Sequence, residues 1–178
     1  SDVYKRQIIT CAKGLTSGYL PLGACIISDE MMERMTHQGE VLFSNGYTYS
    51  GHPVSCAAAL KNIEIMEREK ILEHVQDISP YFQERLLDLK KFPIVGDARG
   101  KGLIGCIEGR LSKDGSRLKD ERKIGKMLDE VCNNMGLIVR PLINMCVFSP
   151  PLIISKSQID DMFNILEQAI VKVSGEFN

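Results

Sequence analysis

The chain has 178 residues, a formal net charge of −1, 44% hydrophobic residues and 25% charged residues. These values are typical of a soluble globular protein and predict neither a nucleic-acid partner nor an anionic membrane surface as partner. No apolar run approaches the roughly 20 residues that a membrane-spanning helix needs. The length suits one domain or parts of two.

Six cysteines are spread along the chain without any CxxC pair: Cys11, Cys25, Cys56, Cys106, Cys132 and Cys146. Their neighbours are apolar, so we expect buried, reduced thiols and a cytoplasmic protein. These spacings favour neither a disulfide framework nor a zinc site, and we expect no metal.

The first predicted elements are two short apolar runs, expected to form buried strands at residues 7–11 and 22–27. Ser28 then has the position of an N-cap for a short helix that ends near residue 35. Residues 36–45 are predicted to form a loop.

Two long helices are predicted next. Pro53 fits the first turn of a helix that ends near Glu69. A second helix covers about residues 71–91, and Pro80 is expected to kink or divide it.

After Pro93 the pattern changes to shorter elements. The predicted strands are 94–100, 103–108, 137–140 and 145–149, and the predicted helices are 120–133 and a last one capped by Ser155. We therefore expect residues 1–92 to end a large α/β domain and residues 93–178 to form a small α+β domain.

Residues 1–7 have no cap and no clear hydrophobic period, so we regard them as a doubtful leader. The strand at 7–11 needs neighbouring strands that the chain does not supply before it. We expect the chain to be the C-terminal part of a longer protein.

The segment from Gly100 to Gly105 reads GKGLIG and matches GxGxxG. A dinucleotide site needs a strand before this motif and a helix that opens inside it. Here a strand-like apolar segment follows, so we expect a bulge or close strand packing instead.

Lys13 follows the apolar run 8–12 and precedes a loop containing Gly14, Gly18 and Pro21. A lysine at the end of a strand lies where α/β enzymes build their sites, and its amine can become a nucleophile toward carbonyl groups. The alternative is a solvated surface charge.

The segment from Ala12 to Ala24, AKGLTSGYLPLGA, resembles the pyridoxal-phosphate lysine segment of class III aminotransferases. The resemblance runs from Ile8 to near the C-terminus. It implies an α/β fold, the C-terminal part of a fold-type I transferase, with pyridoxal 5'-phosphate as cofactor. It also implies that Lys13 is the catalytic and cofactor-binding residue, through a Schiff base. The implied reaction moves an amino group from an amine or amino acid to a keto acid such as pyruvate or 2-oxoglutarate.

Thr48 lies just before the helix that begins at Pro53, where a hydroxyl and free N–H groups favour an anion. A plain turn is the alternative. Residues 46–53, GYTYSGHP, resemble the family segment whose threonine binds cofactor phosphate across a dimer interface. The resemblance therefore implies a homodimer with shared active sites, in which Thr48 serves the partner's cofactor. His52 is expected to be an N-cap or turn residue.

Arg140 ends a predicted strand before Pro141, where its guanidinium can bind a carboxylate through two parallel hydrogen bonds. An ion pair within the small domain is the alternative. The resemblance favours substrate binding by Arg140. Asp97 and Arg99 also match the family, and we expect them to be structural.

The family's ring-nitrogen acid, stacking aromatic residue and phosphate cup precede its lysine, so this chain alone is expected to be inactive. Two alternatives remain for the function. An aminomutase, racemase or decarboxylase on the same scaffold would keep Lys13 and Thr48. A non-catalytic α/β interaction module would leave Lys13 as a surface charge.

Overall fold

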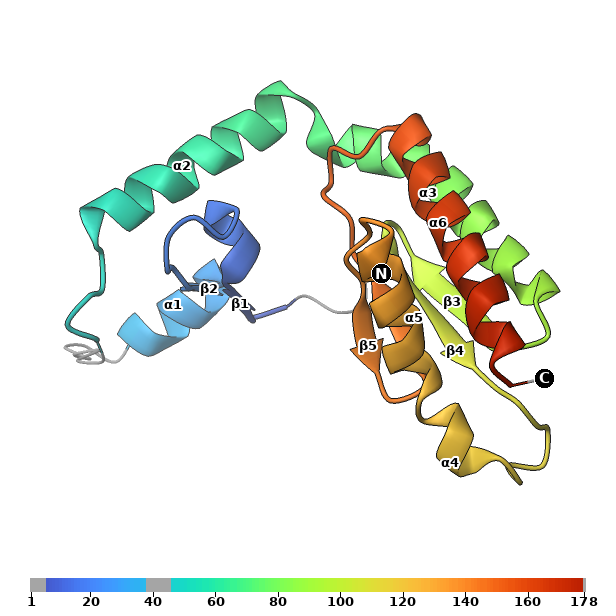
Figure 1. Cartoon of the computed structure of the whole chain (residues 1–178). Helices are drawn as coiled ribbons and strands as arrows, with labels where there is room; N and C mark the ends of the chain where they lie inside the picture. The colour runs from blue at the N-terminus through green and yellow to red at the C-terminus, as the bar shows by residue number, and fades with distance from the viewer. Residues whose placement is uncertain (1–5, 38–45, 178) are drawn as a thin grey trace. The chain divides into compact units, whose positions relative to one another are not determined.

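The computed structural model describes residues 6–37 and 46–177, and the chain divides into two compact units, residues 1–69 and 70–178 (Figure 1). Most of the doubtful leader and of the predicted loop at 36–45 therefore lies outside the described residues. The units divide earlier than residue 92 because helix α3 packs with the second unit. The assignment of 1–92 and 93–178 to domains of a larger protein stays a prediction.

The first unit contains a two-stranded antiparallel sheet of β1 (Ile8–Cys11) and β2 (Ala24–Ile27). Both strands were predicted, but their predicted burial is wrong. Ile9 is 49% exposed and Ile26 is 55% exposed. An isolated pair of strands offers no second layer that could cover its apolar side chains.

Two helices follow, α1 (Asp29–Thr36) and α2 (Pro53–Arg68). The Ser28 side chain accepts a hydrogen bond from the Met31 N–H at 3.3 Å, which confirms the predicted N-cap. Pro53 occupies the first turn of α2, as expected.

The second unit begins with α3 (Ile71–Asp88), which leads into the short 3₁₀ helix η2 (Leu89–Lys91). Pro80 lies inside α3 and does not divide it. Phe82 and Leu86, in the turns after Pro80, are fully buried in the core, and this packing stabilises the helix beyond the proline.

A four-stranded antiparallel sheet has the order β3-β4-β6-β5. Its strands are β3 (Val95–Lys101), β4 (Ile104–Gly109), β5 (Arg140–Leu142) and β6 (Met145–Phe148). The predicted strand at 137–140 was placed too early, because the turn at Ile143 pairs Leu142 with Met145 and so sets where β5 begins.

The predicted helix at 120–133 is two helices, α4 (Leu118–Glu121) and α5 (Ile124–Asn134). The buried Glu121 carboxylate accepts hydrogen bonds from the backbone N–H groups of Leu111 and Ser112, at 3.0 and 3.1 Å. This contact ties α4 to the loop after β4 and separates it from α5.

The last helix is α6 (Lys156–Gly175), and a capping box begins it. Ser155 Oγ accepts from the Gln158 N–H at 3.2 Å, while the Gln158 side chain accepts from the Ser155 N–H at 2.9 Å. The predicted cap at Ser155 is confirmed.

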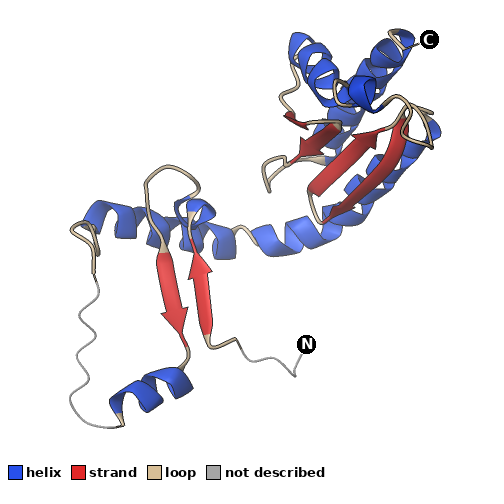
Figure 2. Ribbon diagram, turned by 90° about the horizontal axis from the view of Figure 1, so that it is seen from below, coloured by secondary structure: helices blue, strands red, loops and turns tan. Residues whose placement is uncertain are grey.

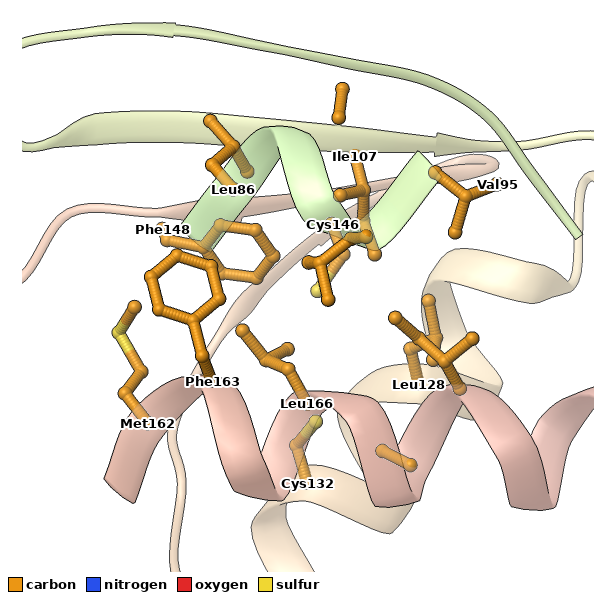
Figure 3. Packing of buried hydrophobic residues seen from close by; sticks show 14 of the residues in the cluster. Leu86, Val95, Ile107, Leu128, Cys132, Cys146, Phe148, Met162, Phe163 and Leu166 are labelled. Carbon is orange, nitrogen blue, oxygen red and sulfur yellow. The ribbon is translucent and has the colours of Figure 1, made fainter. Parts of the chain in front are cut away.

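Helices α3, α5 and α6 pack on one face of the four-stranded sheet (Figure 2). Figure 3 shows Phe163 and Leu166 of α6 pointing toward Phe148 and Ile107 of the sheet. These four side chains are at most 3% exposed, so the core of the second unit is a helix-on-sheet layer.

All six cysteines are free thiols, but the expectation that all are buried is wrong. Cys132 and Cys146 are buried in the core, whereas Cys25, on the uncovered β2, is exposed. His74 is half-buried, and its Nε2 lies 3.0 Å from the Ile154 carbonyl oxygen. Among the described helices, none combines the length and apolar character required to cross a bilayer.

Candidate functional site

Lys13 is separated from the end of β1 by Ala12 alone and begins the 3₁₀ helix η1 (Lys13–Thr16), in the loop that joins β1 to β2. Its backbone has a φ of 51°, in the left-handed region that side chains other than glycine rarely adopt. The side chain is exposed, and its amine has no ion-pair partner among the residues that the structure describes. The amine is therefore available to a ligand.

The loop after Lys13 is held at two points. Thr16 is 2% exposed, and its hydroxyl donates to the Leu20 carbonyl oxygen at 2.5 Å. Asn62 of α2 donates from Nδ2 to the carbonyl oxygens of Gly14 and Leu15, at 3.0 and 3.2 Å. The loop lies against α2, as Figure 2 shows within this unit.

Asn62 was not singled out from the sequence. An asparagine on a helix resembles any solvated polar residue, and its partners lie 47 and 48 positions away in the chain. No local pattern indicates such a contact.

Thr48 lies in a tight turn just before α2. The Ser50 N–H donates to the Tyr47 carbonyl oxygen at 2.9 Å, and the Tyr47 N–H donates to Ser50 Oγ at 3.0 Å. The side chain of Thr48 is exposed and has no hydrogen-bond partner in the described part of the chain. Its hydroxyl is therefore free, in the turn that precedes the positive end of α2.

His52 is the N-cap of α2. Its Nδ1 accepts a hydrogen bond from the Ser55 N–H at 3.4 Å. The expected capping role of His52 is confirmed, because its Nδ1 satisfies the Ser55 N–H in the first turn of α2.

Arg140 begins β5 in the second unit. It pairs with Val147, which pairs with Cys106, which pairs with Arg99, so these side chains form one row across the sheet. The row is on the face opposite the helices, since its neighbours Ile107 and Cys146 point into the core. Arg140 is exposed and forms no ion pair with any described residue.

Arg99, in contrast, is fully engaged. Its Nη1 lies 2.8 Å from Asp97 Oδ2 and 2.9 Å from Glu108 Oε2. Lys90 Nζ also lies 2.9 Å from Asp97 Oδ1. Hydrogen bonds from Lys90 and then Arg99 lower the pKa of Asp97 to about 2. This ion-pair network agrees with the structural role expected for Asp97 and Arg99.

The GxGxxG segment forms the hairpin between β3 and β4. Gly102 has a φ of 60° in the turn, and a Cβ at Gly105 would lie 2.9 Å from Leu86 Cδ2. A strand follows the motif where a dinucleotide site needs a helix, so close packing explains the glycines.

The second unit also has a partly open pocket of about 630 Å³, lined in part by Leu137, Ile138 and Val139 just before Arg140. Arg140 itself does not line it. Lys13 and Thr48 belong to the first unit and Arg140 to the second. No group of three potential metal-ligating side chains occurs within the described ranges.

The sequence profile of the family Aminotransferase class-III matches residues 4–170. The putrescine–pyruvate aminotransferase of Pseudomonas aeruginosa is 40% identical over 165 residues, which cover 92% of this chain and 36% of that protein. The mitochondrial gamma aminobutyrate transaminase 1 of Solanum lycopersicum is 37% identical, over 96% of this chain and 34% of its own length. The chain thus spans about a third of the curated relatives it matches.

Solved structures give the same result. A thermostable (S)-enantioselective omega-transaminase from Thermomicrobium roseum superposes with a TM-score of 0.86 at 37% identity, over 96% of this chain and 38% of that chain. A PMP-bound aminotransferase from Vibrio fluvialis superposes with a TM-score of 0.87 at 34% identity, over 98% of this chain and 39% of that chain. The expected fold, part of a fold-type I transferase, is confirmed.

Proposed function

The chain belongs to the class III aminotransferases, a pyridoxal-phosphate-dependent family, and we propose that it contributes Lys13 as the lysine that binds the cofactor covalently. The observation that supports this most is the unpaired Lys13 amine, placed at a strand end in a loop fixed by Thr16 and Asn62. The proposed reaction transfers an amino group from an amine or amino acid to a keto acid.

The exposed groups suit the chemistry of such a cofactor. When bound, pyridoxal phosphate supplies an aldehyde that links to amines and a ring that withdraws electrons from the linked carbon. Lys13 fits the aldehyde, because its amine is unpaired among the described residues. As a free amine, Lys13 would be the group that moves the proton at the substrate carbon.

We assign the phosphate to Thr48 of the partner subunit in a homodimer. The Thr48 hydroxyl has no partner among the described residues and can donate a hydrogen bond to a phosphate oxygen, in the turn that precedes the positive end of α2. We assign the carboxylate of the substrate to Arg140, whose guanidinium has no carboxylate partner among the described residues. The resemblance to omega-transaminases also implies that this arginine is mobile, because these enzymes also accept amine substrates that lack a carboxylate.

The names of two relatives indicate substrates for trial. Putrescine and gamma-aminobutyrate are amino donors with a terminal amine, and pyruvate is a keto acid acceptor. We propose a donor of this class, and a cytoplasmic location for the protein.

A chimera tests the proposal. Residues 8–178 replace the matching segment of the Pseudomonas aeruginosa relative, which supplies the rest of a transaminase. With pyridoxal phosphate we expect an absorbance band at about 420 nm, borohydride-fixed label on Lys13 and transfer of amino groups to pyruvate. In Lys13→Ala the label disappears and the rate falls by about 10²–10⁴-fold.

Other outcomes would contradict the proposal. Label on Lys13 without consumption of a keto acid would favour an aminomutase, racemase or decarboxylase. No label on Lys13 in a folded chimera would favour the non-catalytic module. The 178-residue chain alone, which spans 36% of that relative, is expected to show no transfer.

A further inference from the structure

The backbone at Lys13 is in an unfavourable conformation. Residues other than glycine rarely adopt the left-handed backbone conformation, and they keep it only where surrounding contacts enforce it. Lys13 has a φ of 51°, and Ser17, four residues later, has a φ of 53°. The contacts that hold this loop therefore fix the position of the Lys13 backbone, from which the side chain and its amine extend.

Asn62 of α2 contacts the two residues that follow Lys13. Its Nδ2 lies 3.0 Å from the carbonyl oxygen of Gly14 and 3.2 Å from that of Leu15, the two residues that follow Lys13. An amide NH₂ group carries two donors, so one side chain can serve both carbonyl groups. The Gly14 carbonyl also accepts from the Ser17 N–H at 3.0 Å, which makes the turn a connected unit.

Helix α2 presents Asn62 from its packed face. Ser55 and Ala59 are 4% and 6% exposed, and Asn62 follows them at helical spacing on the same side. Asn62 is itself half-buried. It is therefore a fixed point on a long helix and not a freely moving surface amide.

We propose that Asn62 is a positioning residue for Lys13: it holds the two peptide groups after the lysine and so fixes the origin of the reactive amine. This inference rests on the proposed role of Lys13. Its physical basis is that a reacting amine held within a narrow range of positions reacts faster than one on a mobile loop.

Asn62→Asp tests the donors directly, because the carboxylate has nearly the same shape but turns an acceptor toward two carbonyl oxygens. Asn62→Leu removes all hydrogen bonding and keeps a good helix former. Asn62→Gln retains the NH₂ group on a longer side chain and should restore part of the function. The matched control is Glu64→Gln, an acid-to-amide change on the same helix, where Glu64 is exposed and pairs with Lys61.

Two readouts in the chimera separate positioning from folding. The first is the rate at which pyridoxal phosphate labels Lys13, fixed by borohydride and located by peptide mapping. We expect Asn62→Asp and Asn62→Leu to lower this rate about tenfold, the loss expected from one or two hydrogen bonds. We expect Asn62→Gln to recover part of it and Glu64→Gln to leave it unchanged. The second readout is amide exchange without cofactor, in which Ser17 and Gly18 should exchange faster in Asn62→Asp.

Each outcome decides the matter. Wild-type labelling and wild-type exchange in both Asn62→Asp and Asn62→Leu would overturn the inference and leave the role of Lys13 intact. A lower melting temperature with an unchanged labelling rate at a temperature where the variant is folded would make Asn62 purely structural. Absence of label in the wild-type chimera would remove the proposed function and this inference together.

Discussion

Gly125 lies against the carbonyl oxygen of Met145, so closely that a Cβ at Gly125 would stand 2.5 Å from it and 2.7 Å from the carbonyl oxygen of Ile143. Helix α5 thus packs directly on the turn between β5 and β6. Gly125→Ala must displace backbone atoms, and we expect it to lower the free energy of unfolding by about 1–3 kcal/mol. Urea unfolding followed by circular dichroism measures this.

Gly175→Ala is the matched control. It lies at the end of α6, and a Cβ there would meet no heavy atom within 4 Å. The same substitution should stabilise the helix by up to about 1 kcal/mol. Equal effects at the two positions would show that α5 does not contact the turn as described.

The lowered pKa of Asp97 predicts that the free energy of unfolding depends on pH. Hydrogen bonds from Lys90 and Arg99 lower its pKa from 3.8 to about 2. Because the folded pKa is lower than the unfolded one, the carboxylate stabilises the fold above pH 3.8, and this contribution is lost as the pH falls toward 2. The side chain is 41% exposed, so solvent screening should keep the contribution below about 1 kcal/mol.

Asp97→Asn checks this contribution. The difference in unfolding free energy between the wild type and this variant should be constant above about pH 5 and should shrink below pH 4. A difference that stays constant down to pH 2 would contradict the ion-pair network.

The thiols should differ in reactivity. Burial raises the pKa of Cys132 to about 11 and raises that of Cys146 further above its usual range. Both thiols therefore remain protonated at pH 8, and since the thiolate is the nucleophile they should react far more slowly with iodoacetamide than exposed Cys25. Peptide mass spectrometry before and after urea measures this. Equal labelling in the native chain would contradict the described core.

Local signals predicted the elements that depend on local physics. Ser28 and Ser155 were found as N-caps, and Pro53 was found at the start of α2, because each needs only its own next turn of helix. Features that depend on contacts between distant residues were predicted less well: the strands β1 and β2 were found, but their burial and the break after α4 were not. The break between α4 and α5 depends on Glu121 reaching the backbone of Leu111.

The candidate site also combines features that local sequence indicates with contacts that it does not. The hypothesis for Lys13 rests on the residues around it, since a strand end and a glycine loop are both local features. The support from Asn62 comes from another helix, and no spacing in the sequence could reveal it. Likewise, the sequence left Arg140 undecided between an ion pair and a ligand, and only the sheet register places it apart from the Asp97 network.

Arg140 gives the last prediction. If it binds the substrate carboxylate, Arg140→Ala in the chimera should raise the KM for pyruvate by about 10–100-fold, because charge-assisted hydrogen bonds contribute about 1.5–3 kcal/mol. The kcat should change little, since the carboxylate keeps its charge throughout the reaction. Arg140→Lys should restore only part of the affinity, because an ammonium cannot form the two parallel bonds of a guanidinium.

The discriminating measurement uses an aldehyde acceptor that has no carboxylate. Its KM should be the same in the wild type and in Arg140→Ala, because the lost contact is specific to the carboxylate. Arg122→Ala, at an exposed arginine in the second unit, should change neither KM. An equal rise for pyruvate and the aldehyde would mean that Arg140 supports the fold of β5, since a general loss of structure does not distinguish acceptors by charge.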